Sequence, residues 1–178
     1  MKTDTGGSRR VALYAGTFDP ITLGHLSVIE RGARLFDRVL VVVAVNPSKE
    51  PLFTVEERVE MIREVVAGWP SVECTSTGGY VVQLAREHAA RYLVRGVRSC
   101  TDVEAEIALA NLNHELAPEI ETVFVPAHPE LSLVSSSRLK ELARQGMDIS
   151  SYCPAEIATR LQRRLTEWAG TEREAAHV

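Results

Sequence analysis

A chain of 178 residues is long enough for one domain with its own hydrophobic core. Apolar residues make up 45% of it and charged residues 25%, an ordinary balance for a globular protein. The formal net charge of −4 excludes bulk attraction to nucleic acid or to an anionic membrane, so neither is expected as a partner. An anionic ligand would therefore need a local cluster of basic side chains and backbone N–H groups.

Cysteine usage and the sequences of the chain ends restrict the cellular compartment in which the protein is expected. Cys74, Cys100 and Cys153 are far apart and form no C-x-x-C pair, which argues against a disulfide framework and a zinc site and predicts a cytoplasmic location. The first ten residues lack the apolar core of a secretory signal, and no apolar run approaches the roughly 20 residues of a membrane span. Residues 1–9 and 169–178 are predicted as disordered tails.

Strands and helices alternate along the chain. Strands are predicted at 10–16, 38–45, 71–76, 91–96 and 120–127, and helices at 23–36, 54–68, 80–90, 101–116, 135–146 and 154–165. The continuous β-branched run at 38–45 is typical of a strand buried on both faces. Helix boundaries are signalled by capping pairs Thr54 with Glu57 and Thr101 with Glu104, by Gly146 as a stop, and by Pro154 at the first helical position.

Five strands separated by helices predict an α/β fold, a doubly wound parallel five-stranded sheet of the Rossmann-like kind with C-terminal helices. Ligands of such sheets bind at the carboxyl ends of the strands, near the point where the strand order reverses. The loops to search are therefore 16–22, 46–53, 76–79, 96–100 and 127–136.

Four of these five loops carry groups suited to phosphate. The set comprises Thr17 and His25 with Gly24, then Ser48 and Lys49, then Arg95, Gly96 and Arg98, and finally Ser135, Ser136 and Ser137 at a predicted helix start. Helix N-termini favour anions because their N–H groups and dipole point at the ligand. Cations and helix N-termini gathered at one sheet edge of an acidic protein predict a polyphosphate site.

Each of these residues also has a purely structural interpretation. His25 alone is more often a helix-start residue that bonds the backbone. Lys49 follows Ser48 and precedes Glu50 in a polar loop, where it could simply be solvated. The two arginines could pair with Asp102 or Glu104 in surface bridges of little energetic value. The serines could be a redundant N-cap.

Two motifs carry a resemblance to a known family. Thr22-Leu23-Gly24-His25, within GTFDPITLGH, resembles the T-x-G-H signature of the nucleotidyltransferase superfamily, and VSSSRLKEL resembles its I-S-S-T-x-x-R signature. Over 10–165 the chain is similar to the phosphopantetheine adenylyltransferase family, through blocks such as NPSKEPLFTVEERVEMI and LVRGVRSCTDVEAEIALANLNHEL. The resemblance places a nucleotidyltransferase domain at 10–166.

The resemblance implies a reaction and a set of residues. ATP and 4′-phosphopantetheine would give dephospho-coenzyme A and pyrophosphate, with Mg²⁺ held mainly by phosphates and water, in a homohexamer. The catalytic residues implied are His25, Lys49, Thr17 and Arg98. The ATP-binding residues implied are Thr17, Phe18, His25, Gly96, Val97, Arg98, Glu106, Leu131, Ser132, Leu133, Val134, Ser135, Ser136 and Ser137. The acceptor-binding residues implied are Thr17, Lys49, Val81, Arg95, Leu109, Leu112 and Asn113.

The chain departs from the family where its aromatic "DFEYE"-like block reads DVEAE, with Val103 and Ala105. Acceptor selectivity is therefore open at the sequence level. Two alternatives remain beside phosphopantetheine adenylyl transfer. One is the same chemistry on another phosphorylated acceptor, for example one like nicotinamide mononucleotide. The other is a non-catalytic nucleotide-binding protein, which Thr17, His25 and Lys49 disfavour.

Overall fold

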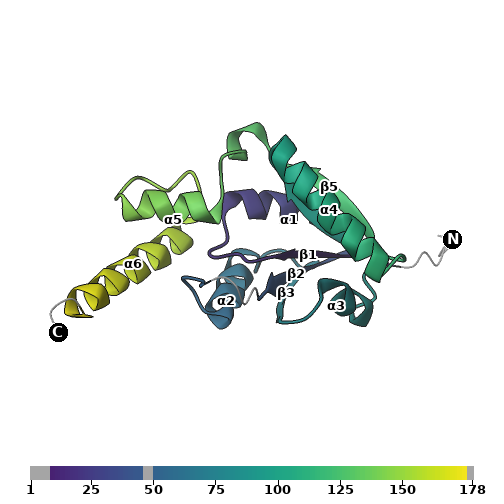
Figure 1. Ribbon diagram of the computed structural model, residues 1–178, viewed down its shortest axis with the longest axis horizontal. Coiled ribbons are helices and arrows are strands. Elements are labelled where there is room, and N and C mark those ends of the chain that lie inside the picture. Colours follow the sequence, from purple (N-terminus) through teal and green to yellow (C-terminus); the bar gives the residue numbers. More distant parts are fainter. Residues whose placement is uncertain (1–8, 46–49, 176–178) are drawn as a thin grey trace.

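The structure is a computed structural model that describes residues 9–45 and 50–175, with side chains up to residue 168. Its strands are β1 (Val11–Gly16), β2 (Arg38–Ala44), β3 (Val72–Thr77), β4 (Tyr92–Val97) and β5 (Glu121–Pro126). Its helices are α1 (Leu23–Leu35), α2 (Val55–Val65), α3 (Val81–Glu87), α4 (Cys100–Leu116), α5 (Ser136–Arg144) and α6 (Ala155–Ala175), with a 3₁₀ turn at Pro129–Leu131. Figure 1 shows these elements.

The strands form one sheet in the order β3-β2-β1-β4-β5, and every pair is parallel. The chain moves outward from β1 to β3, then crosses back to place β4 on the other side of β1. The strand order therefore reverses between β1 and β4, which is the predicted doubly wound topology and the expected place for a ligand.

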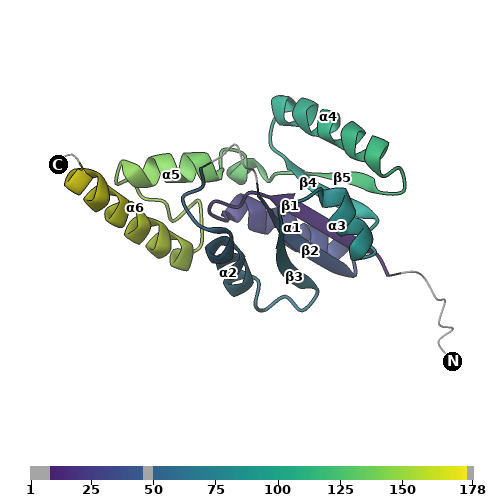
Figure 2. The same ribbon diagram turned by 60° about the horizontal axis from the view of Figure 1, so that its bottom comes forward.

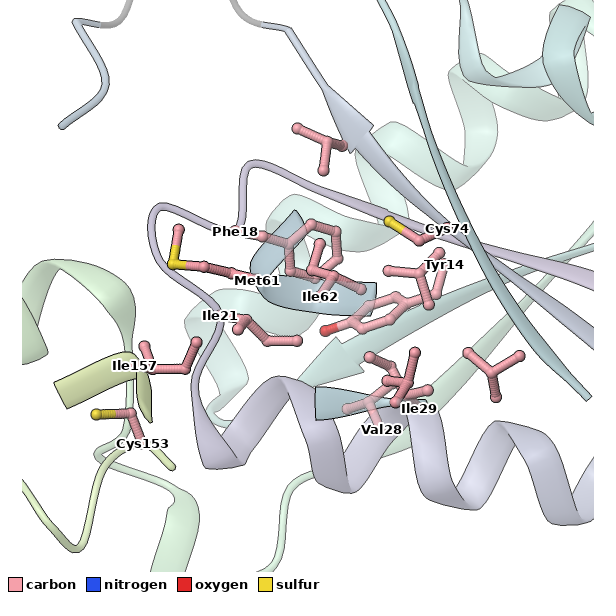
Figure 3. Close-up of a cluster of buried hydrophobic side chains, with 14 of the residues drawn as sticks. Tyr14, Phe18, Ile21, Val28, Ile29, Met61, Ile62, Cys74, Cys153 and Ile157 are labelled. Atoms are coloured by element: carbon pink, nitrogen blue, oxygen red, sulfur yellow. The ribbon is translucent and has the colours of Figure 1, made fainter. Parts of the chain in front are cut away.

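Alternating side chains of the sheet supply two cores. Tyr14 of β1 packs in one core with α1 and α2, whereas Leu13 packs on the opposite face with α3. The interior strand β2 is buried along Val39 to Val43, as its β-branched run predicted. Figure 3 shows Tyr14 and Phe18 among the core side chains of the first face. Core side chains therefore cover the sheet on both faces.

Helices α5 and α6 lie side by side beyond the carboxyl ends of the strands, away from the N-terminus, in both Figure 1 and Figure 2. The β1–α1 loop and the start of α5 are also joined directly, because the Ser136 hydroxyl donates to the Pro20 carbonyl at 2.8 Å. The C-terminal helices therefore stand over the edge of the sheet where a ligand is expected.

Helix ends differ from the sequence prediction in three places. Helix α4 is capped by Ser99 rather than Thr101, because the Ser99 hydroxyl accepts from the Asp102 N–H at 3.1 Å and the helix begins one residue earlier. Pro154 precedes α6, and its carbonyl accepts the first helical bonds. The same helix continues to Ala175, so the predicted C-terminal tail is helical from 169 to 175. Its run of Ala, Glu and Arg favours helix strongly enough to pass Gly170.

Candidate active site

A cavity of about 230 Å³ lies at the carboxyl ends of β1 and β4, where the strand order reverses. Three segments far apart in the chain form its walls: the end of β1 with the start of α1, the end of β4 with α4, and residues 127–136. Its lining comprises Tyr14, Ala15, Gly16, Thr22, Gly24, His25, Val28, Arg95, Gly96, Val97, Arg98, Asp102, Glu106, Ala127, Leu131, Val134, Ser135 and Ser136. The fold thus brings three of the predicted loops together.

His25 lies in this cavity because of how α1 begins. Thr22 is the N-cap and His25 is the third residue of the helix, and each side chain caps the backbone of the other. The Thr22 N–H donates to His25 Nδ1 at 3.1 Å, and the His25 N–H donates to the Thr22 hydroxyl at 3.3 Å. The T-x-G-H sequence is therefore a capping box that aims an imidazole at the cavity.

The capping bond also decides which nitrogen of His25 carries the proton. An Nδ1 that accepts from a backbone N–H leaves the proton of the neutral ring on Nε2. Burial, and secondarily the positive charge of Arg98, lower the pKa of His25 to about 4. At neutral pH the ring is therefore uncharged and offers an Nε2–H donor on the side opposite the helix cap.

Aromatic packing fixes the plane of the His25 ring. The Phe18 ring meets it edge to face with centroids 5.0 Å apart, and Tyr14 meets Phe18 in the same manner at 5.4 Å. Phe18 has a positive φ of 48° and is only 2% exposed. This left-handed backbone is disfavoured for a bulky side chain, and the burial of the ring offsets the strain.

Two arginines enter the cavity, each held by a carboxylate of α4. Arg95 forms a bidentate pair with Glu106 at 2.6 and 2.7 Å and also donates to the Ala15 carbonyl at 2.7 Å. Arg98 pairs with Asp102 through Nε at 2.9 Å and Nη2 at 3.3 Å. The predicted bridge from Arg98 to Asp102 is thus present, whereas Arg95 pairs with Glu106 instead of Asp102 or Glu104. A bound phosphate would have to share these arginines with the carboxylates or displace the carboxylates from them.

The close approach of β4 to α1 requires a glycine. A Cβ added to Gly96 would meet Val28 at 2.9 Å, whereas one added to Gly24 would have ordinary contacts of 3.5 Å and longer. Gly96 is therefore needed for packing. Gly24 lines the cavity, so its missing side chain leaves space there instead.

The start of α5 closes the cavity on its third side. Ser135 is the N-cap and accepts from the Arg138 N–H at 3.2 Å, while the Ser136 hydroxyl is bonded to the β1–α1 loop. The first-turn N–H groups and the helix dipole give this end a positive character. The serine triplet is thus both an N-cap and a wall of the cavity.

A second cavity of about 250 Å³ adjoins the first and shares Ser136 with it. Its lining comprises Thr17, Asp19, Glu50, Pro51, Ser136, Ser137 and Lys140. Thr17 and Ser137, predicted with the rest of the site, therefore face this second cavity. The two cavities meet at the N-terminus of α5.

Several predicted residues do not line the first cavity. Phe18 supports it from the core, and Leu133 is 80% exposed. The acceptor candidates Leu109 and Leu112 lie on α4 with 38% and 50% exposure. The remaining predicted residues outside both linings are Ser132, Val81 and Asn113. Lys49 and Ser48 lie outside the described residues.

The sequence prediction overlooked six polar residues that line the two cavities, which are Tyr14, Thr22, Asp19, Glu50, Asp102 as a cavity wall, and Lys140. It also overlooked the buried Arg58, which bonds the Thr17 carbonyl. Lys140 occupies the last position of the second signature, so the motif could have indicated it. Asp19 stands two residues after Thr17 within the first quoted block. Nothing in the α2 pattern distinguishes Arg58, which is only 2% exposed.

The described part of the chain holds neither a metal-ligand cluster nor a membrane-spanning helix. No group of three or more His, Cys, Asp or Glu side chains there could hold a metal ion. No helix among the same residues is long and apolar enough to cross a membrane.

Comparison with known proteins decides the family. The cytidylyltransferase-like family model matches residues 13–142. The phosphopantetheine adenylyltransferase of Heliobacterium modesticaldum is 46% identical over 151 residues, covering 85% of this chain and 90% of the relative. That of Limosilactobacillus reuteri is 49% identical over 158 residues, covering 89% and 91%.

The chain belongs to the phosphopantetheine adenylyltransferase family. Among solved structures, the nicotinic acid mononucleotide adenylyltransferase of Plasmodium falciparum in complex with NaAD has a TM-score of 0.65 at 14% identity, covering 90% of this chain and 96% of that chain. This likeness confirms the Rossmann-like nucleotidyltransferase fold. The resemblance drawn from the two signatures is therefore confirmed at the level of both fold and family.

Proposed function

We propose that this protein transfers the adenylyl group of ATP to 4′-phosphopantetheine, giving dephospho-coenzyme A and pyrophosphate. The choice of 4′-phosphopantetheine as the acceptor rests on the 46–49% identity to phosphopantetheine adenylyltransferases over most of the chain. The cavity supports the chemistry, since a neutral imidazole donor, two arginines and a helix N-terminus surround one space. Such groups stabilise charge that develops on phosphoryl oxygens.

The step is an in-line displacement at the α-phosphorus. An oxygen of the acceptor phosphate forms a bond to the α-phosphorus, and the bond from that phosphorus to the bridging oxygen of the β-phosphate breaks. The electron pair leaves with pyrophosphate. A phosphate is already largely ionised at neutral pH, so no general base is required, and positioning with charge stabilisation supplies the catalysis.

His25 is proposed to act as a hydrogen-bond donor to the α-phosphate. Its Nε2–H is available because Nδ1 is engaged by the Thr22 N–H. The ring is uncharged at neutral pH, so it stabilises the crowded, negatively charged transition state through one directed bond rather than through charge. Thr17 is proposed to contact the reacting phosphates from the second cavity.

Other residues are proposed to hold the two substrates. Arg98, with Gly96 and Val97, would bind ATP, with Glu106 nearby, and the start of α5 with the preceding residues from Leu131 would hold the β- and γ-phosphates. Arg95 would bind the acceptor phosphate. Lys49 keeps the role implied by the family resemblance, as a cation at the acceptor phosphate and the reacting centre. The two cavities meeting at Ser136 suit two phosphorylated substrates that react at their junction.

Mg²⁺ is proposed to enter with the triphosphate of ATP. The donor set fits an ion held mainly by phosphate oxygens and water, because the two carboxylates in the first cavity, Asp102 and Glu106, are bonded to arginines. When bound, the ion would neutralise charge on the leaving pyrophosphate.

The assembly is proposed to be a homohexamer in the cytoplasm. On helix α4, Leu109, Leu112 and Leu116 follow i, i+3, i+7 spacing and are between 38% and 50% exposed, which is an apolar face suited to contact with another subunit. All three cysteines of the chain are free thiols, consistent with a reducing compartment.

The test is pyrophosphate release from ATP with a panel of acceptors: 4′-phosphopantetheine, unphosphorylated pantetheine, nicotinamide mononucleotide and nicotinic acid mononucleotide. We expect kcat/KM to be highest for 4′-phosphopantetheine by several orders of magnitude, because a missing phosphate leaves cations unpaired. A higher value for either mononucleotide would assign the enzyme to another acceptor.

A further inference from the structure

Asp19 is a buried carboxylate that joins three separate segments at the second cavity. Its side chain accepts from the N–H of Phe53 at 3.0 Å and of Leu52 at 3.0 Å, and from Lys140 Nζ at 2.6 Å. The residue is only 4% exposed. One carboxylate therefore ties the β1–α1 loop to the segment before α2 and to helix α5.

Arg164 holds the same segment from the opposite side. It donates from Nη1 to the Leu52 carbonyl at 2.8 Å, pairs with Glu57 of α2, and lies 5.0 Å from the centroid of the Phe53 ring. Leu52 is thus held through its N–H by Asp19 and through its carbonyl by Arg164. Through Arg164 and Leu52, helix α6 reaches the segment that adjoins the cavity wall. The helix itself lies beyond residues 13–142, which the family model matches.

Arg58 secures the β1–α1 loop one residue away from Phe18. It donates to the Thr17 carbonyl at 2.8 Å and to the Thr54 carbonyl at 3.1 Å. Figure 3 shows Ile21 of the same loop among the core side chains, with Met61 of α2 and Ile157 of α6 nearby. Thr17 therefore stands between two buried anchors, the Arg58 bond to its own carbonyl and the Asp19 carboxylate.

On the basis of the adenylyl transfer proposed above, we propose that Asp19 and Arg164 are positioning residues that fix the second cavity from the C-terminal helix. Neither acts on substrate. Asp19 has its oxygens occupied by three donors, and Arg164 acts through Leu52 and Phe53. Together they hold Leu52 and Phe53, which directly follow Glu50 and Pro51 of the cavity lining. Small displacements of groups around a reacting centre lower the rate strongly, so loosening this wall should reduce turnover.

Arg160 provides a matched control on the same helix. It lies one turn before Arg164, has a similar exposure of 25% against 27%, and also pairs with glutamates of α2, Glu60 and Glu64. Among the described residues, its side-chain bonds go to these glutamates and not to the 50–53 segment. Arg160→Met and Arg164→Met therefore remove comparable ion pairs, but only the second removes a bond to the segment that adjoins the cavity wall.

The first measurement is amide hydrogen exchange on the full chain. In Arg164→Met and Asp19→Asn, the peptide that contains Leu52 and Phe53 should exchange at least about tenfold faster than in wild type and in Arg160→Met, since exchange requires breaking the bonds that these variants weaken. The second measurement is steady-state turnover. Arg164→Met should lower kcat about tenfold with the KM for ATP nearly unchanged, and Asp19→Asn should lower it further.

Arg164→Lys separates positioning from general stabilisation. A lysine can keep an ion pair with Glu57 but cannot span Leu52 and Glu57 with one fork, so the unfolding midpoint should recover while kcat recovers only in part. Equal kcat values for Arg164→Met and Arg160→Met, or unchanged exchange at Leu52 and Phe53, would overturn the proposal. If wild type releases no pyrophosphate, the proposed function fails, and the exchange comparison alone decides whether the two residues hold the wall.

Discussion

Helices α1 and α4 both begin at the carboxyl edge of the sheet and both line the same cavity, yet the chain holds them differently. Helix α1 buries Val28, Ile29 and Gly32, and its capping box fixes His25. Helix α4 buries none of its residues and contributes Asp102 and Glu106, each bonded to an arginine.

The difference separates two kinds of site component. The α1 component is complete within one chain, because a cap, a core and an aromatic contact determine where the imidazole lies. The α4 component is a set of ion pairs that a phosphate can rearrange, on a helix whose outer apolar face is uncovered in one chain. We therefore expect the first to govern the rate and the second to govern binding and assembly.

The largest effect is expected from His25→Ala. Loss of a single donor to transition-state charge typically lowers kcat on the order of a hundredfold or more, with little change in the affinity for ATP. His25→Gln, which keeps an N–H donor, should recover part of the rate. Single-turnover rates together with calorimetric ATP binding test this, and a variant with normal ATP binding and near wild-type turnover would remove His25 from the mechanism.

A smaller effect, on substrate binding, is expected from replacing either arginine that pairs with a carboxylate of α4. Arg98→Ala should weaken ATP binding by roughly 10- to 100-fold, because charge-assisted hydrogen bonds contribute about 1.5–3 kcal/mol each. Arg95→Ala should instead raise the KM for the acceptor. Titration of both variants with both substrates distinguishes the roles, and equal losses for both ligands would show that the arginines form one undivided site.

The pH dependence of stability tests how firmly α1 fixes its histidine. His25 titrates near 6.5 when unfolded and near 4 when folded, so between these values the unfolded state binds the extra proton. The free energy of unfolding therefore contains a contribution that is fully present above pH 6.5 and is lost as the pH falls toward 4, on the order of 1 to 3 kcal/mol. Urea titrations of wild type and His25→Gln should differ in slope across this window, and parallel curves would contradict the low pKa.

The smallest effect on the isolated chain is expected from Leu112→Arg on the outer face of α4. Leu112 is 50% exposed, so the charge should leave the fold intact but disrupt an apolar contact between subunits. Sedimentation velocity should then show smaller species than for wild type. Met147→Arg, at a similarly exposed apolar residue between α5 and α6, is the control and should leave assembly unchanged.

The order of elements and the place of the site follow from the sequence alone. The β-branched run at 38–45 indicated a strand buried on both faces, and alternation with helices indicated parallel pairing. His25 and the serine triplet were indicated as site residues by the signatures, and Arg95 and Arg98 were indicated by their place in a loop at the carboxyl edge of the sheet. These features depend on local pattern and on one topological rule, so they need no knowledge of side-chain contacts.

The partners of those residues were decided only by the tertiary structure. Arg95 bonds Glu106 rather than Asp102 or Glu104, which are nearer in the sequence, because of how α4 crosses β4. Arg164 reaches Leu52 because of where α6 packs. The low pKa of His25 likewise comes from burial between β1, α1 and Arg98. Burial and long-range pairing arise when segments distant in the chain meet, so a sequence can indicate which residues belong to the site, but the fold determines what each one touches.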